Sequence, residues 1–204
     1  MDTNKKFWDK SAKIYDFAIK KDKNAYKKVI ERIRSILKKD MNVLEIATGT
    51  GLIAVSIASF CKTIEATDFS EEMIKTAKQK HSAHNLVFSV ANATNLPYPD
   101  CSYDVVVISN ALHIMPNPAS ALNNIKRVLK DDGFLIAPTF MRNSHITGII
   151  REFIMKIAGF KTFSKWDYRQ YLQFIIDNDW EIKEKDCFKA SYPLAFVIAK
   201  KNKR

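Results

Sequence analysis

The sequence has few cysteines and no long apolar run among its 204 residues. A membrane-spanning helix needs about 20 consecutive apolar residues, so none is expected. The opening residues, MDTNKK, are polar and no apolar signal segment follows them, which argues against export. Cys61, Cys101 and Cys187 are odd in number and far apart, which excludes a disulfide framework and a cysteine metal site. The sequence therefore predicts a cytoplasmic protein without a bound metal.

Acidic residues are too few to balance the basic ones, and the excess of basic residues is confined to the two ends of the sequence. The net charge is +11, with 13 basic and 6 acidic residues in 1–40, four basic residues in 200–204, and a neutral stretch between them. A nucleic-acid-binding protein usually carries its basic residues on a face of the folded body, so a nucleic-acid partner is not expected. A solvated Lys-rich arm is the simple interpretation. Attraction of this arm to an anionic substrate or a membrane surface is the alternative.

Internal repeats and low-complexity linkers are also absent, and the length suits a single domain. From Asn42 onward, short apolar runs alternate with helical patterns. Strands that are buried on both faces have such continuous apolar runs, so the alternation predicts βαβ units and a parallel sheet. The expected strands are 43–47, 63–67, 86–90, 103–109 and 133–139, and the expected helices between them are 51–60, 70–81 and 118–130.

Capping residues support these boundaries. Ser70 and Asn117 are good N-caps, and Pro118 suits the first helical position. Gly133 is expected to stop the helix that Pro118 begins. In the last third, helical patterns at 147–159 and 165–178 precede two β-like segments, 180–188 and 193–200. Their short connection cannot make a parallel crossover, so they are expected to pair as an antiparallel hairpin.

Three expected strand ends offer groups that suit an adenosine. Gly49 and Gly51, in VLEIATGTGLIAV, allow a sharp turn and a close approach of the backbone to a ligand. Asp68 ends the second strand and can accept hydrogen bonds from ribose hydroxyls, because the carboxyl ends of adjacent parallel strands line one crevice. Asn92 and Ala93 follow the third strand and can meet a purine edge. Phe69 and Met73 could sandwich the purine ring.

Two cofactor classes fit an adenosine beside a glycine turn. Residues 49–54 match the G-x-G-x-x-A pattern of dinucleotide-binding proteins, which leaves an NAD(P)-dependent oxidoreductase as an alternative. Glu45 lies just before the turn, where a carboxylate would repel a pyrophosphate and attract an amino group or a sulfonium. The charge argument therefore favours S-adenosyl-L-methionine, with S-adenosyl-L-homocysteine as its product.

Four segments resemble the class I S-adenosylmethionine-dependent methyltransferases, in particular the small-molecule (type 11) branch similar to the quinone-biosynthesis C-methyltransferases. They are VLEIATGTG, EATDFSEEMIKTA, ANATNLPYPDCSYDVVVISNALHIMPNP and ALNNIKRVLKDDGFLIA, in the family's order and spacing. The resemblance implies a Rossmann-like, doubly wound α/β sheet of seven strands, mostly parallel with an antiparallel last strand, and a helical N-terminal lid. It divides the single domain 1–204 into a lid (1–40), a cofactor-binding half (41–140) and an acceptor side with the C-terminal hairpin (141–204).

The same resemblance implies roles for individual residues. Glu45 would lie near the amino group of the methionine moiety, and Asn110 would border the sulfonium and the acceptor. Two positions depart from the family. Ala47 stands in place of a glycine, and an alanine is tolerable there only if the residue has a negative φ. Asn92 stands in place of an acid, and its side-chain oxygen can still accept a hydrogen bond from an adenine amino group. The cofactor-binding residues implied are Glu45, Ala47, Gly49, Gly51, Asp68, Phe69, Met73, Asn92, Ala93 and Asn110.

Methyl transfer by in-line displacement needs neither a Ser/His/Asp triad nor a metal, and the sequence shows neither. His113 and Tyr15 are the candidate catalytic residues, each with simple packing as the alternative. No acidic residue lies between Asp132 and Glu152, which favours a small apolar or anionic acceptor. A non-catalytic adenosine-binding module stays open as an alternative. A nucleic-acid methyltransferase is disfavoured, because SNALHIM stands where a D/N-P-P-Y-type run would be expected.

Overall fold

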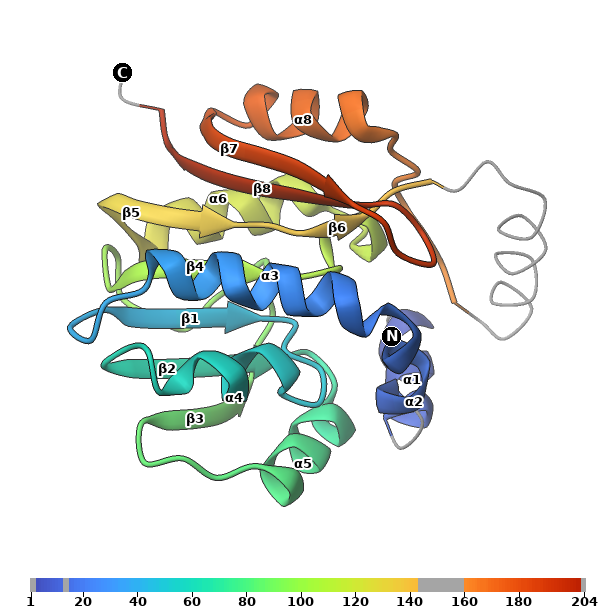
Figure 1. Cartoon of the computed structure of the whole chain (residues 1–204), viewed down its shortest axis with the longest axis vertical. Coiled ribbons are helices and arrows are strands. Elements are labelled where there is room, and N and C mark those ends of the chain that lie inside the picture. The colour runs from blue at the N-terminus through green and yellow to red at the C-terminus, as the bar shows by residue number, and fades with distance from the viewer. Residues whose placement is uncertain (1–2, 13–14, 143–159, 203–204) are drawn as a thin grey trace.

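The computed structural model describes residues 3–12, 15–142 and 160–202, whose strands form one twisted sheet with helices on both faces (Figure 1). The sheet has eight strands within these residues. They are β1 (Asn42–Ile46), β2 (Thr63–Asp68), β3 (Leu86–Val90), β4 (Tyr103–Ile108), β5 (Leu129–Ile136), β6 (Thr139–Phe140), β7 (Trp180–Phe188) and β8 (Leu194–Lys201).

The strand order confirms a doubly wound sheet with a reversed last strand. The first five strands lie in the order β3-β2-β1-β4-β5 and are parallel. β8 runs antiparallel to both β5 and β7, as the short connection between 180–188 and 193–200 predicted. β6 also pairs with β8 and follows β5 along it, because Ala137 and Pro138 interrupt the strand that was expected over 133–139. The two-residue strand β6 raises the number of strands in the described residues to eight, one more than the seven expected.

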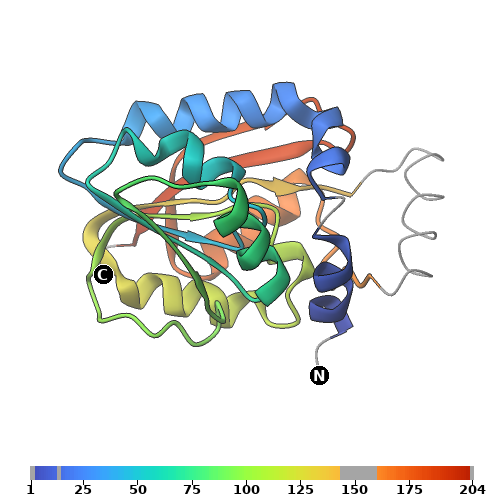
Figure 2. The ribbon, with the colours of Figure 1, turned by 90° about the horizontal axis from the view of Figure 1, so that it is seen from below.

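Helices cover the two faces of the sheet because the central strands are apolar on both sides. Val105 and Val107 of β4 contact a core formed with α3, α4 and α5, whereas Val106 and Ile108 contact the core under α6 and α8. Figure 2 shows α3 and α6 on opposite sides of the strands. These helices are α3 (Lys23–Ile36), α4 (Leu52–Ala58), α5 (Glu71–Lys80), α6 (Pro118–Val128) and α8 (Tyr168–Asp177).

The predicted caps are present, but the predicted helix stop is not. The Ser70 side chain accepts a hydrogen bond from the Met73 N–H, and the Asn117 side chain accepts one from the Ser120 N–H. The expectation that Gly133 ends a helix is wrong, because α6 ends at Val128 and Gly133 lies within β5. A Cβ at Gly133 would lie 2.9 Å from the Asp104 carbonyl oxygen, so glycine permits a close approach of two strands there.

The N-terminal helices differ in position, because two stand beyond one edge of the sheet and the third packs on it. α1 (Thr3–Ser11), α2 (Tyr15–Ile19) and the 3-10 helix η1 (Lys20–Asp22) precede α3, and α1 and α2 stand beyond the carboxyl ends of the parallel strands (Figures 1 and 2). α3 instead packs on the sheet through Tyr26, Val29 and Ile33, so only the first part of the expected lid 1–40 has a lid's position. The expected helix at 147–159 lies outside the described residues.

Candidate functional site

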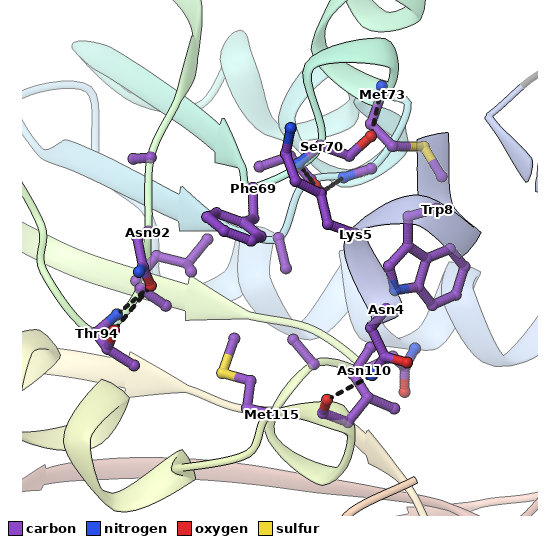
Figure 3. Close-up of a pocket in the computed structure, with 18 of the residues that line it drawn as sticks. Asn4, Lys5, Trp8, Phe69, Ser70, Met73, Asn92, Thr94, Asn110 and Met115 are labelled. Atoms are coloured by element: carbon purple, nitrogen blue, oxygen red, sulfur yellow. Dashed lines mark hydrogen bonds between the residues drawn. The ribbon is translucent and has the colours of Figure 1, made fainter. Parts of the chain in front are cut away.

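A cavity of about 420 Å³ opens where the carboxyl ends of β1, β2, β3 and β4 meet α1 (Figure 3). The structure brings eight of the ten predicted cofactor-binding residues to its wall: Ala47, Gly49, Asp68, Phe69, Met73, Asn92, Ala93 and Asn110. Glu45 and Gly51 do not line it. Sequence reasoning missed Asn4, Lys5 and Trp8, which α1 contributes, and Met115, which follows the short helix η2 (Leu112–Ile114).

The turn between β1 and α4 consists largely of residues in the left-handed region. Ala47 has φ +57°, Gly49 +57° and Gly51 +89°. The expectation that Ala47 has a negative φ is therefore wrong, since this turn needs left-handed backbone at its first position as well. Gly51 does not line the cavity, but its left-handed φ and its packing both favour glycine, because an added Cβ would lie 2.8 Å from Cζ of the buried Phe88 ring.

The Ala47→Gly variant should be more stable than the wild type by about 0.5–1 kcal/mol, because glycine adopts a left-handed φ without the strain that a Cβ causes. Urea unfolding of both proteins measures the difference. Ala54→Gly, in the interior of α4, is the matched control and should lose stability. Lower stability of Ala47→Gly would show that the alanine methyl contributes more by packing than it costs in strain.

The carboxylate of Asp68 is held in place by backbone groups. Its Oδ2 accepts from the Gly49 N–H at 2.8 Å, and its Oδ1 accepts from the Ser70 N–H at 2.9 Å. Burial raises the pKa of Asp68 above its ordinary value, against the opposing effect of backbone hydrogen bonds from Ser70, Gly49 and Phe69. A carboxylate can accept about four hydrogen bonds, so the group is fixed in orientation and keeps acceptor capacity toward the cavity.

Glu45 lies beneath the turn and is buried. Its Oε2 accepts from the Thr48 hydroxyl at 2.8 Å, and it also receives the Ala54 N–H. Burial raises its pKa to about 8, with the nearby Asp68 charge acting in the same direction. The structure therefore places Glu45 beneath the turn, which it joins to α4, and outside the residues that line the cavity. Its expected position near the amino group of the methionine moiety stays a prediction.

The stability of the protein should depend on pH through Glu45. Its pKa is about 8 in the folded state against an ordinary value of 4.5. The stability that this group contributes is thus fully present below about pH 4.5 and is lost as the pH rises toward 8, at up to about 1.4 kcal/mol per pH unit. Glu45→Gln should lose less stability over this range than the wild type.

Urea unfolding at pH 5, 6, 7 and 8 measures this dependence. Glu31→Gln, at an exposed carboxylate of α3, is the control and should follow the wild type. Equal slopes for Glu45→Gln and the wild type would mean that Glu45 is ionised throughout.

Phe69 and Met73, which were expected to sandwich a purine ring, both line the cavity, but they differ in exposure. The Phe69 ring is 42% exposed and faces the cavity, with Nζ of Lys5 5.9 Å from its centroid (Figure 3). Met73 is 2% exposed and lies on the Trp8 side of the cavity in this view. The Met115 side chain extends toward Phe69 from the loop after β4, so it is better placed than Met73 to cover a second face of a bound ring.

Asn92 and Asn110 have their amide oxygens occupied within the protein. Oδ1 of Asn92 accepts from the N–H and the hydroxyl of Thr94, so it is not the free acceptor that was expected. Asn110, at φ +53°, donates from Nδ2 to the Tyr26 hydroxyl and accepts at Oδ1 from the Phe140 N–H. Both side chains are therefore fixed at the cavity wall by their own hydrogen bonds.

Neither candidate catalytic residue is brought to the cavity by the described structure. His113 does not line it; its Nδ1 is buried without a hydrogen-bond partner among the described residues, and burial lowers its pKa to about 4. A histidine with this pKa is a weak base at neutral pH. Tyr15 begins α2, and its side chain lies outside what the structure describes.

The described residues contain no group of three or more His, Cys, Asp or Glu side chains that could bind a metal ion. None of the helices in 3–12, 15–142 and 160–202 has the length and apolar character needed to cross a membrane.

A comparison with protein families relates part of this chain to a known family. Residues 44–137, slightly less than half of the chain, match the model of the family described as methyltransferase domain. Over these residues the sequence is similar to a methyltransferase domain. The match spans the strands from β1 to β5 and every predicted cofactor-binding residue, and it agrees with the resemblance to the class I S-adenosylmethionine-dependent enzymes.

Individual relatives of the methyltransferase domain agree with this. The ubiquinone/menaquinone biosynthesis C-methyltransferase UbiE of Rickettsia bellii is 35% identical over 122 residues, which cover 55% of this chain and 49% of that protein. The chain thus spans about half the length of the curated relatives it matches. The alternatives of an oxidoreductase and a non-catalytic module receive no support from the comparisons.

Solved structures show the same fold. A chain of the complex between the Haloferax volcanii Trm112 methyltransferase activator and a methyltransferase has a TM-score of 0.83 at 16% identity, over 96% of this chain and 98% of that one. An S-adenosylmethionine-dependent methyltransferase from Thermotoga maritima has a TM-score of 0.74 at 21% identity, over 97% and 99%. At these identities the likeness concerns the fold alone, and it extends beyond residues 44–137 to nearly the whole chain.

Proposed function

We propose that this protein transfers a methyl group from S-adenosylmethionine to a small acceptor by in-line displacement. The observation that carries the proposal is the cavity at the carboxyl ends of β1 to β4. It combines a carboxylate fixed by two backbone N–H groups with an exposed aromatic ring, in a region similar to a methyltransferase domain. These groups fit the cofactor, since a nucleoside offers hydroxyl donors to Asp68 and a flat ring to Phe69.

Within this proposal, the residues of the cavity bind and orient the cofactor and the acceptor, and they exclude water. The cofactor supplies the methyl group on a sulfonium centre. Asp68 accepts from ribose hydroxyls, Phe69 and Met115 cover the adenine, and the Ala93 backbone meets its edge. Gly49 and Ala47 leave room beside the turn for the methionine moiety. The helix α1 covers the cavity, so the reacting atoms are shielded from bulk water.

The acceptor is proposed to be small and either apolar or anionic. Among the described residues that line the cavity, Lys5 and Asp68 carry the only charges, and α1 and the loop after β4 contribute Trp8, Ile114 and Met115. This wall favours a molecule with a large apolar surface. We also keep the prediction of a cytoplasmic location, which the free thiols of Cys61, Cys101 and Cys187 support.

The basic arm is proposed to allow peripheral membrane contact. Phe17 of α2 is 72% exposed, and Lys20, Lys21 and Lys23 follow it at the surface. An exposed aromatic ring next to lysines suits an anionic lipid surface. Sedimentation with phosphatidylserine vesicles tests this, and equal recovery with neutral vesicles would contradict it.

Two measurements test the proposed activity. Calorimetry should detect S-adenosylhomocysteine binding and no NADH binding, and the reverse result would favour the oxidoreductase. A screen of small acceptors that reads out S-adenosylhomocysteine release should find a turnover that depends on both the acceptor and the enzyme. Cofactor binding without turnover on any acceptor class would favour a non-catalytic module.

A further inference from the structure

The Asn4 side chain joins three parts of the chain at the roof of the cavity. Asn4 lies in α1, lines the cavity and is 5% exposed. Its Nδ2 donates to the carbonyl oxygens of Ile114 and Lys161, both at 2.9 Å, and its Oδ1 accepts from the Lys161 N–H at 2.9 Å. The partners are 110 and 157 positions away in the sequence, so these bonds exist only when α1 is docked.

The pairing with Lys161 requires an amide side chain. Asn4 bonds both the N–H and the carbonyl of one residue, as a neighbouring backbone would do in a sheet. A carboxylate of the same shape could accept from the Lys161 N–H but could not donate, and it would face two carbonyl oxygens. Because the site is buried, losing these donors leaves polar groups without partners, which is costly.

These bonds connect the two sides of the acceptor end of the cavity. Trp8 projects from α1 on one side, and Ile114 and Met115 form the loop after β4 on the other. The Phe160 ring beside Lys161 packs against Phe7 and Trp8, with ring centroids 5.1 and 5.5 Å apart. Aromatic packing at Phe160 and buried hydrogen bonds at Lys161 therefore both dock α1 to this segment.

α1 also makes polar contacts to the cofactor side, one of them an exposed ion pair and another a part-buried hydrogen bond. Lys5 pairs with Glu71 at 3.1 Å, where the Glu71 side chain is 73% exposed, and Asp9 accepts from the Ser70 hydroxyl. An exposed ion pair contributes little to stability. The buried contacts of Asn4 are thus the specific attachment of α1 to the acceptor side.

We propose that Asn4 is a positioning residue that holds α1 closed over the cavity and so completes the wall that receives the acceptor. Without its hydrogen bonds, α1 opens on the acceptor side while the sheet stays intact. The proposal rests on the proposed function only for the identity of the ligand beneath α1; the docking of the helix is a property of the free protein.

Hydrogen exchange of the full chain without ligand tests the docking. Asn4→Asp keeps the shape of the side chain and removes the donors, and a negative charge in the first turn of a helix does not itself weaken that helix. We expect the amides of α1 to exchange about tenfold faster or more in Asn4→Asp than in the wild type, with unchanged exchange in β1 and β4. Asn24→Asp, the same change at an exposed position of α3, is the matched control and should leave α1 unchanged. Equal exchange of α1 in Asn4→Asp and Asn24→Asp would overturn the proposal.

The release of S-adenosylhomocysteine gives a second readout. We expect it to leave Asn4→Asp about tenfold faster than the wild type and Asn24→Asp at the wild-type rate. Faster exchange of α1 with an unchanged rate of release would overturn the role of α1 as a cover. If the wild type does not bind S-adenosylhomocysteine, the proposed function fails, while hydrogen exchange still decides whether Asn4 docks α1.

Discussion

Replacing Asp68 by asparagine should weaken the binding of S-adenosylhomocysteine about 10- to 100-fold. The wild-type carboxylate accepts the Gly49 and Ser70 N–H groups and keeps acceptor capacity toward the cavity. Asparagine has one oxygen in place of two, so a backbone N–H and a ribose hydroxyl compete for it. A hydrogen bond to a charged group contributes about 1.5–3 kcal/mol, which gives the expected loss of affinity. Calorimetry of both proteins measures it.

Glu65→Gln is the matched control for this substitution. Glu65 lies on the same strand, accepts hydrogen bonds from the Ser89 and Tyr98 hydroxyls and does not line the cavity. Its replacement should change the affinity less than about threefold. If Asp68→Asn bound S-adenosylhomocysteine as tightly as the wild type, Asp68 would not contact the nucleoside, and the assignment of the ribose site would be wrong.

Replacing Gly51 by alanine should destabilise the protein by about 2–5 kcal/mol. The φ of Gly51 is +89°, where a Cβ costs about 1–2 kcal/mol, and the new Cβ would lie 2.8 Å from Cζ and 3.0 Å from Cε1 of Phe88. The Phe88 ring is 6% exposed and cannot move away freely, so overpacking adds about 1–3 kcal/mol. Urea unfolding measures the loss.

The double variant Gly51→Ala/Phe88→Leu separates the two contributions. A leucine at position 88 removes the ring atoms that the new Cβ meets. The Gly51→Ala substitution should therefore cost less in the Phe88→Leu background than in the wild type, which is the non-additivity expected of residues in contact. Equal costs in both backgrounds would assign the whole effect to the backbone conformation of Gly51.

The central sheet could be predicted from the sequence because its signals are local. Each central strand is an apolar run buried on both faces, and Ser70 and Asn117 mark where two helices begin. The errors occur where a tertiary contact determines the role of a residue. Gly133 has the sequence position of a helix stop, yet it lies within β5, where glycine permits a close approach to the Asp104 carbonyl oxygen. Nothing in the sequence shows that proximity.

The sequence predicted the cavity residues that stand at strand ends, but not those that α1 contributes. Asp68 and Asn92 stand at strand ends, and parallel strands bring their carboxyl ends together in any sheet of this kind. Glu45 does not line the cavity, because its side chain is buried beneath the turn and bonds the Thr48 hydroxyl there. The contribution of α1 depends on the contacts of Asn4 with residues more than a hundred positions away, for which the chain has no local signal.

The most direct test of this account is a crystal structure of the protein grown with S-adenosylhomocysteine. We expect the compound in the cavity beneath α1, with its ribose hydroxyls on Asp68, its adenine against Phe69 and its sulfur directed toward Asn110. An empty cavity at saturating concentration, or the compound bound elsewhere on the molecule, would contradict the account.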